Sequence, residues 1–121
     1  MEGQVSWVVE LAVKEGKLDA FRELMEEMVE GTSAEPRTLA YEWYISEDGS
    51  EVHIYEKYAD SDAMIQHVNG FLDRWAGRFM ERADITRFVV YGDPSPAARE
   101  ILDGWGARYL GPWGGFSRFS G

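Results

Sequence analysis

A single histidine on the apolar face of an expected helix is the strongest candidate for chemistry in this sequence. His67 lies three residues after Met64 and four residues before Phe71, and this spacing places all three on one helical face. An imidazole exchanges protons near neutral pH, so His67 in an apolar wall could act as a general base toward a phenolic or enolic substrate. The alternative is a structural role, in which a half-buried His67 bonds to a nearby carbonyl or carboxylate.

The strand that precedes this helix carries a carboxylate on its apolar side. Val52, Ile54 and Tyr58 alternate with more polar residues, which is the period of a half-buried strand, and Glu56 shares their face. A buried carboxylate needs a partner such as an arginine, and an ion pair that holds a dimer together is the favoured role for Glu56. Glu56 could instead orient a substrate hydroxyl.

Several side chains could complete a small-molecule site around the histidine. The expected substrate-binding residues are Tyr44, Tyr55, Asn69, Phe71 and Trp75. The aromatic rings would stack on a flat ligand, and the amide of Asn69 could donate a hydrogen bond to an oxyanion. For the aromatic residues an ordinary hydrophobic core remains the alternative, because its spacing is the same.

A metal site is not expected. The second histidine, His53, lies on the strand that carries Tyr55 and Lys57, where exposure to solvent or to a dimer partner is the favoured interpretation. Two histidines this far apart, in a chain without cysteine, lack the spacing of metal ligands.

The elements that must position these residues follow a recognisable order. They are strand 5–13, helix 17–30, strands 39–46 and 52–58 around a turn at Asp48-Gly49, a helix from about 61 to 69–70 with a second helical piece through Phe79, and strand 86–91. Asp60, Ser61 or Asp62 can cap the second helix, because their side-chain oxygens accept from its unpaired N–H groups. The resulting β-α-β-β-α-β order predicts an α+β, ferredoxin-like fold with both helices on one face of a four-stranded sheet.

The other face of such a sheet has no cover within the chain. The apolar strand residues expected there are Trp7, Val9, Leu11, Tyr41, Trp43 and Ile45. A second copy of the chain is the simplest cover for an apolar face, so we predict a homodimer joined sheet to sheet, a dimeric α/β barrel.

The C-terminal residues are additional to this core. We expect residues 1–94 to form the ferredoxin-like domain and residues 95–121 to add a short helix and a tail of alternating glycines and aromatics. The tail could pack as a strap on its own subunit, clasp the partner as an arm, or cover a ligand site as a lid.

Composition limits the function further. The 121 residues suffice for one domain, and the net charge of −10 disfavours binding to nucleic acid or to anionic membranes. The absence of cysteine excludes disulfides, thiolate metal sites and cysteine nucleophiles. The N-terminus lacks a basic region and no apolar run approaches a membrane span, so a cytoplasmic protein is the default expectation.

The chain resembles the antibiotic biosynthesis monooxygenase family of dimeric α/β-barrel proteins, including its quinol monooxygenase-like members. The resemblance rests on the order of elements over roughly residues 4–93 and on the segment Tyr55-Glu56-Lys57-Tyr58-Ala59-Asp60 followed by a helix with an internal histidine. It implies a pocket between sheet and helices, and oxidation of quinols or anthrones by molecular oxygen without metal, flavin or other cofactor. Two features differ from the family. The position of its frequent second histidine is occupied by Asn69-Gly70-Phe71, and strand 5–13 lacks the asparagine of haem-degrading relatives.

These observations lead to one main hypothesis and two alternatives. The main hypothesis is a cofactor-independent monooxygenase for a small aromatic or quinol-type substrate, with His67 as the base. The first alternative is a non-catalytic dimeric protein of the same fold that binds a small apolar molecule. The second is an isomerase or decarboxylase that uses the same base without oxygen.

Overall fold

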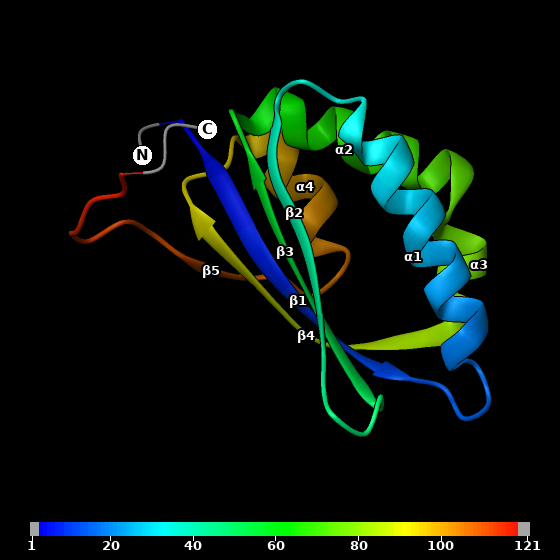
Figure 1. The fold of residues 1–121 in the computed structure, drawn as a ribbon. Coiled ribbons are helices and arrows are strands. Elements are labelled where there is room, and N and C mark those ends of the chain that lie inside the picture. The colour runs from blue at the N-terminus through cyan, green and yellow to red at the C-terminus, as the bar shows by residue number, and fades with distance from the viewer. Residues whose placement is uncertain (1–2, 119–121) are drawn as a thin grey trace.

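The computed structural model describes residues 3–118, which form one sheet and the helices that pack on it (Figure 1). The elements in chain order are β1 (Val5–Val13), α1 (Leu18–Ser33), β2 (Thr38–Ile45), β3 (Glu51–Tyr58), α2 (Ser61–Arg74), α3 (Ala76–Arg82), β4 (Ala83–Gly92), α4 (Pro96–Asp103) and β5 (Arg108–Leu110). The predicted α+β, ferredoxin-like order is confirmed, with α2 and α3 together in the place of the second helix.

The strands form a mixed sheet in the order β2-β3-β1-β4-β5. The first four strands pair antiparallel, whereas β5 pairs parallel with β4 at the edge. Helices α1, α2 and α3 lie on one side of the sheet (Figure 1). Helix α4 packs beside α2, and its Ala98 and Leu102 are buried in the common core.

The helices cover the sheet face that the sequence led us to expect uncovered. Trp7, Val9 and Leu11 are at most 8% exposed and belong to the core under the helices. Tyr41 and Trp43 pack on the same core, and only Ile45, at the end of β2, is largely exposed. The predicted alternation is correct but the side was wrong, because the apolar strand face packs against the apolar stripes of the helices.

The bare side of the sheet, called the open face from here on, is therefore of mixed polarity. It comprises Ser6, Val8 and Glu10 of β1, Glu42 and Tyr44 of β2, His53, Tyr55 and Lys57 of β3, and Arg87, Val89 and Tyr91 of β4. Apart from Val89, which is itself only 4% exposed, these residues alternate with the buried residues of the same strands, as the pleat of a sheet requires.

Both long helices continue past the residues expected to end them. α1 runs through Gly31 to Ser33, and α2 runs through Asn69-Gly70 to Arg74. Glycine is needed at position 31 for close packing and not for a turn. A Cβ there would lie 2.7 Å from Cζ2 of Trp75. Gly31 thus allows α1 to approach the junction of α2 and α3 closely.

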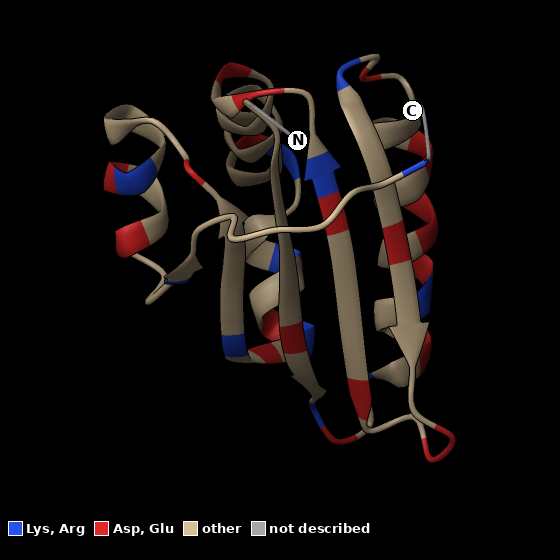
Figure 2. Ribbon diagram, turned by 90° about the vertical axis from the view of Figure 1, so that its left-hand side faces the viewer, with Lys and Arg blue, Asp and Glu red and all other residues tan. Residues whose placement is uncertain are grey.

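The C-terminal residues begin on the sheet and then leave it. Ser95 caps α4 as expected, by accepting from the N–H of Ala98, and Trp105 packs against Phe71 and Phe88. Beyond β5, residues 111–118 cross in front of the open face without resting on it (Figure 2). Trp113 is fully exposed and Phe116 is 80% exposed.

Residues 111–118 are exposed, whereas Trp105 and Tyr109 earlier in the tail pack against the core of their own chain. The strap, arm and lid interpretations of the tail stay predictions. The last part of the predicted tail, residues 119–121, lies outside the described residues. The division of the chain after residue 94 remains a prediction, although β5 joins the second part to the sheet of the first.

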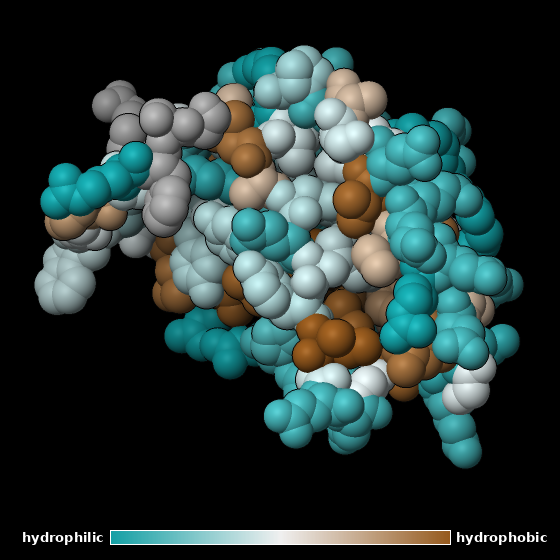
Figure 3. Space-filling model, in the orientation of Figure 1, coloured by the Kyte–Doolittle hydropathy of each residue, from teal (hydrophilic) through white to brown (hydrophobic). Residues whose placement is uncertain are grey.

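Hydrophobic side chains also reach the surface along the seam between β2 and α1 (Figure 3). Leu18, Met25 and Ile45 line a hollow of about 150 Å³ there. Within residues 3–118, no helix combines the length and the apolar character that a membrane crossing requires.

The close packing at Gly31 can be tested with a matched pair of substitutions. Gly31→Ala should lower the free energy of unfolding by about 1–3 kcal/mol, because the new methyl group overlaps the indole of Trp75. Gly77→Ala, in α3, has no atom within 4 Å of the added Cβ and should be neutral or stabilising by up to about 1 kcal/mol. Urea unfolding measures both. Equal effects of the two substitutions would contradict the proposed packing role.

Candidate active site

A cavity of about 290 Å³ lies between the sheet and the helices, and its wall is mostly aromatic and aliphatic. Trp7, Phe71, Phe79, Phe88 and Trp105 contribute aromatic rings. The ionisable side chains that reach the cavity are those of Tyr41, Glu56 and His67. Such a combination of an apolar wall and a few converging polar groups is typical of a small-molecule site.

Helix α2 carries His67 into this wall. Asp60 fixes the start of the helix, since its carboxylate accepts from the N–H of Ala63 over 2.9 Å and pairs with Arg37, which lies in the loop between α1 and β2. Two turns later His67 is only 4% exposed. Its buried, cavity-lining position agrees with the helical spacing seen in the sequence.

Both ring nitrogens of His67 face carboxylates. Nδ1 lies 2.9 Å from Oε1 of Glu35, and Nε2 lies 3.4 Å from Oε1 of Glu56. A carboxylate accepts hydrogen bonds, so Glu35 favours a proton on Nδ1. Nε2 is then the nitrogen that can gain or lose a proton on the side of Glu56.

Glu56 is buried on β3 without an arginine. It is 6% exposed, and its Oε1 accepts a hydrogen bond from the hydroxyl of Tyr58. Burial raises the pKa of Glu56, and the neighbouring His67 partly opposes that increase. The predicted arginine partner and the ion pair across a dimer are wrong, because Glu56 faces the helices and is paired with His67.

Two tyrosines enclose the same group of side chains. The rings of Tyr41 and Tyr58 lie with their centroids 5.5 Å and 5.4 Å from that of His67. Burial and the nearby Glu56 raise the pKa of both phenols well above the usual value, so both remain neutral donors near neutral pH.

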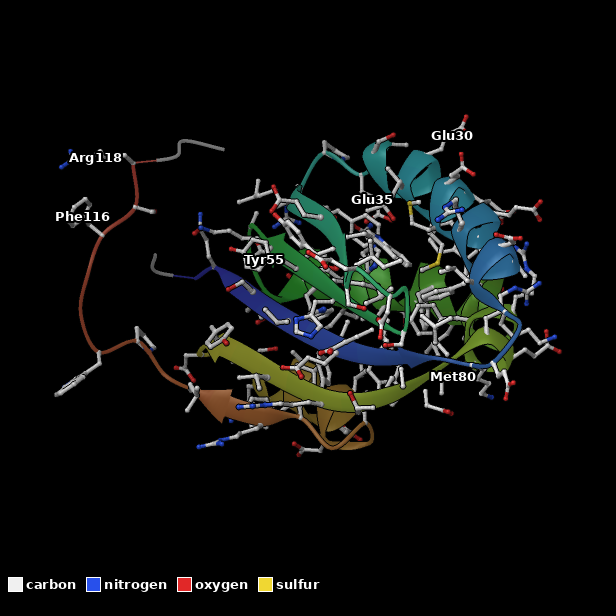
Figure 4. All side chains as sticks on the ribbon, turned by 60° about the horizontal axis from the view of Figure 1, so that its bottom comes forward. Glu30, Glu35, Tyr55, Met80, Phe116 and Arg118 are labelled. Carbon is white, nitrogen blue, oxygen red and sulfur yellow. The ribbon has the colours of Figure 1, made fainter. Side chains whose placement is uncertain are left out.

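Only two of the expected site residues line the cavity, His67 and Phe71. Tyr44 and Tyr55 lie on the open face, and Tyr44 is 58% exposed with its hydroxyl bonded to Glu42 (Tyr55 is labelled in Figure 4). The reason is the alternation along each strand: once Glu56 and Trp43 face the helices, the residues next to them face away.

The other two expected residues lie elsewhere on the helices. Asn69 is exposed on α2, one position away from the buried Val68. Trp75 is buried outside the cavity wall, and its indole N–H donates to Oε2 of Glu27 over 2.8 Å. Trp75 therefore joins α1 to the junction of α2 and α3.

Several residues of the site have no signal in the sequence that marks them as site residues. Trp7 on β1 and Tyr41 on β2 are the cross-strand partners of Glu56, so strand registers would have been needed to find them. Glu35 lies between α1 and β2, in a loop without periodicity (Figure 4). Its distance of 32 residues from His67 leaves no local signal.

One group of possible metal ligands lies on the other side of the sheet. Glu10, Glu51 and His53 bring one ligand atom each within 4.8 Å of one another. His53 Nε2 is 2.6 Å from Glu51 and 3.8 Å from Glu10, which is the geometry of a partly exposed ion pair. None of these residues lines the cavity.

The family model described as antibiotic biosynthesis monooxygenase matches residues 5–72 of this chain. This span contains Glu35, Glu56 and His67. A search among curated proteins found no match.

Solved structures with the same fold are similar to the chain over most of its length. MupZ from Pseudomonas fluorescens is 23% identical with a TM-score of 0.85, over 95% of this chain and 94% of that one. SnoaB from Streptomyces nogalater, described as a cofactor-independent oxygenase, is 14% identical with a TM-score of 0.64, over 77% and 95%. Rv0793 from Mycobacterium tuberculosis is 24% identical with a TM-score of 0.64, over 78% and 98%. At these identities the likeness establishes the fold and not the activity.

The raised pKa of Glu56 predicts a specific dependence of stability on pH. The fold favours the protonated carboxyl, so its stabilisation is complete below the unfolded pKa, near 4.5, and is lost as the pH rises through the folded pKa. Glu56→Gln cannot ionise but keeps the shape. Wild type should therefore lose stability between pH 4 and pH 8 in a way that Glu56→Gln does not. The free energy of unfolding of Glu56→Gln minus that of wild type should be larger at pH 8 than at pH 4. Urea unfolding at both pH values measures the difference, and Glu47→Gln in the β2–β3 turn is the control for loss of a surface carboxylate. A difference independent of pH would refute the assignment.

Proposed function

This chain belongs to the antibiotic biosynthesis monooxygenase family, and on that premise we propose that it is a cofactor-independent monooxygenase for a small aromatic or quinol-type substrate. The observation that carries the proposal is the pair of His67 and Glu56, with 3.4 Å between Nε2 and Oε1, in the wall of an aromatic cavity. The rings of Trp7, Phe71 and Phe88 would hold a flat substrate by stacking. A cavity of about 290 Å³ suits a small ligand.

In this proposal His67 is the base and needs no metal or organic cofactor. Removal of a proton from a phenolic hydroxyl produces an electron-rich anion, which can transfer an electron to molecular oxygen. The apolar wall would exclude water from the anion and from the oxygen-bearing intermediate. Glu35 supports the role of His67, because its carboxylate keeps a proton on Nδ1 and leaves Nε2 to exchange one.

The site residues proposed from the sequence are revised accordingly. We propose His67 as the catalytic base and Phe71 as a substrate-binding residue. Tyr44, Tyr55, Asn69 and Trp75 are not proposed to touch the substrate, since none of them lines the cavity.

A non-catalytic binding protein is the second candidate. The specific observation in its favour is that Asn69-Gly70-Phe71 stands where family members often carry a second histidine, and Asn69 itself is exposed. In that case the same cavity would hold a small apolar ligand without turnover.

Oxygen uptake separates the two candidates. Purified protein with a metal chelator should consume oxygen with at least one member of a panel of quinols and hydroxyanthrones. His67→Ala should lower kcat/KM by at least about 100-fold, the usual contribution of a positioned general base. His53→Ala, which removes the other histidine, should retain turnover. Tight binding of the same compounds without oxygen uptake would instead establish the binding protein.

We also propose that the chain forms a homodimer through its open face. Val8 lies there beside Tyr55 in the strand register, and the two give the centre of this mixed face some partly exposed apolar surface, whereas the neighbouring Val89 is already buried. Residues 111–118 stand off the same face with Trp113 fully exposed, and they would clasp the second copy as an arm. A cytoplasmic location remains a prediction from the sequence.

The proposed interface can be tested by light scattering after gel filtration. Val8→Glu should convert the dimer to monomer, because it buries a charge at the centre of the interface without a partner. Val29→Glu, on the exposed side of α1, is the matched control and should remain dimeric. Removal of residues 111–121 should weaken the dimer and preserve the fold. A monomeric wild type would rule out the interface.

A further inference from the structure

We infer that Glu56, His67 and Glu35 act together as one proton store. In it Glu56 exchanges the proton with the substrate, and Glu35 orients His67 by a hydrogen bond at Nδ1. The inference rests on the proposed monooxygenase function and assigns two further residues to that site. Glu56 is the catalytic residue that meets the substrate, and Glu35 is a positioning residue.

Two carboxylates and two phenol rings surround the imidazole of His67. One nitrogen lies 2.9 Å from Glu35 and the other 3.4 Å from Glu56. The rings of Tyr41 and Tyr58 lie at 5.5 Å and 5.4 Å. Since Nε2 of His67 lies 3.4 Å from Glu56, a proton that Glu56 takes from a substrate can pass on to His67 as the final base.

Glu56 is accessible from the cavity. Its contacts with Tyr58 and with His67 are both made by Oε1, and the indole of Trp7, which also lines the cavity, lowers its pKa by a hydrogen bond to the same carboxylate. Glu56 lines the cavity together with its cross-strand neighbours Trp7 and Tyr41. Burial raises the pKa of Glu56, so its carboxylate is a stronger base than an exposed one.

Glu35 contacts His67 at Nδ1 and does not line the cavity. Its Oε1 accepts from Thr38 Oγ1 over 2.8 Å as well as from His67, and its Oε2 lies 3.9 Å from Arg74. On its outer side Glu35 borders a surface hollow of about 340 Å³ that Arg37 and Gln66 also line. Glu35 is thus fixed by several contacts and touches solvent rather than substrate.

A proton can move along this group over short distances. Nδ1 and Nε2 of His67 lie 2.9 Å and 3.4 Å from carboxylate oxygens, so an imidazole with protons on both nitrogens keeps an acceptor at each end. The store would therefore take a proton from the substrate and hold it close enough to return it.

Oxidation of a quinol-type substrate needs such a reversible store. The phenolic proton passes to Glu56 and on to His67, and the phenolate transfers an electron to molecular oxygen. The resulting radical pair forms a C–O bond, and the stored proton returns to the terminal peroxide oxygen. Glu56 then takes the proton from the carbon that carries the peroxide. The electron pair of the broken C–H bond forms the C=O bond as the O–O bond breaks. The leaving hydroxide takes the proton from Glu56 to give water. One substrate and one oxygen molecule yield one quinone and one water, so no net proton is lost.

The experiment has a readout that does not depend on activity. Nitrogen-15 NMR of the labelled full chain reports which ring nitrogens carry protons. With only two histidines in the chain, a His53→Asn variant assigns the signals of His67. We expect a proton on Nδ1 in wild type, and a mixture of tautomers in Glu35→Ala. A bare Nδ1 in wild type, or an unchanged spectrum in Glu35→Ala, would overturn the proton store.

Kinetics of the active protein give the second readout. Glu56→Gln should lower kcat by at least about 100-fold. Glu35→Gln, which keeps the shape but removes the charge, should lower kcat by about 10-fold to 100-fold with little change in KM, because Glu35 does not touch substrate. Glu30→Gln, an exposed carboxylate near the end of α1 (Figure 4), is the control and should match wild type. Wild-type kcat in Glu56→Gln would overturn its catalytic role. The two proposals can fail separately. If NMR shows the expected tautomer but the protein consumes no oxygen with any substrate, the proton store is supported and the monooxygenase is refuted.

Discussion

The burial of one carboxyl group organises this structure. Glu56 lies under the helices among apolar residues, where an unpaired charge would cost far more than the fold can supply. The hydroxyl of Tyr58 and the imidazole of His67 satisfy it, and His67 in turn requires Glu35. Three segments distant in the sequence are thereby fixed around one end of the cavity.

The contacts between helices keep this group aligned. Glu35 follows the end of α1, whereas His67 lies on α2, so their 2.9 Å contact depends on how the two helices pack. Gly31 lets α1 reach the indole of Trp75, and Glu27 accepts from both Trp75 and Arg78. Packing far from the cavity therefore determines the geometry inside it, which is common in sites built on rigid elements.

The two sides of the sheet differ in polarity because successive side chains along each strand point to opposite faces. The inner side is mostly apolar, with Glu56 and the hydroxyls of Tyr41 and Tyr58 as polar groups, and it forms the floor of the cavity. The open face mixes charges with a few apolar side chains, and the exposed residues 111–118 stand in front of it. A mixed face of this kind resembles an interface between proteins more than a core.

Local patterns determined the elements, and only tertiary contacts determined the site. Alternation in β3 and the helical spacing of Met64, His67 and Phe71 are properties of neighbouring residues, so the sequence alone predicted the ferredoxin-like order and a buried His67. The same patterns do not say which face of the sheet the helices cover. That depends on packing energy summed over the whole core, and for this reason the open face was misassigned.

The ends of the helices and the partners of His67 could not be predicted from neighbouring residues either, because they depend on contacts between distant segments. Gly31 and Gly70 are ordinary helix breakers until the neighbouring Trp75 and the remaining helical hydrogen bonds are considered. Glu35 meets His67 across 32 residues, and Trp7 and Tyr41 meet Glu56 through strand pairing. The sequence by itself specified the fold and one candidate base. The tertiary structure decided which carboxylates surround that base, because contacts between distant segments leave no periodic trace in the chain.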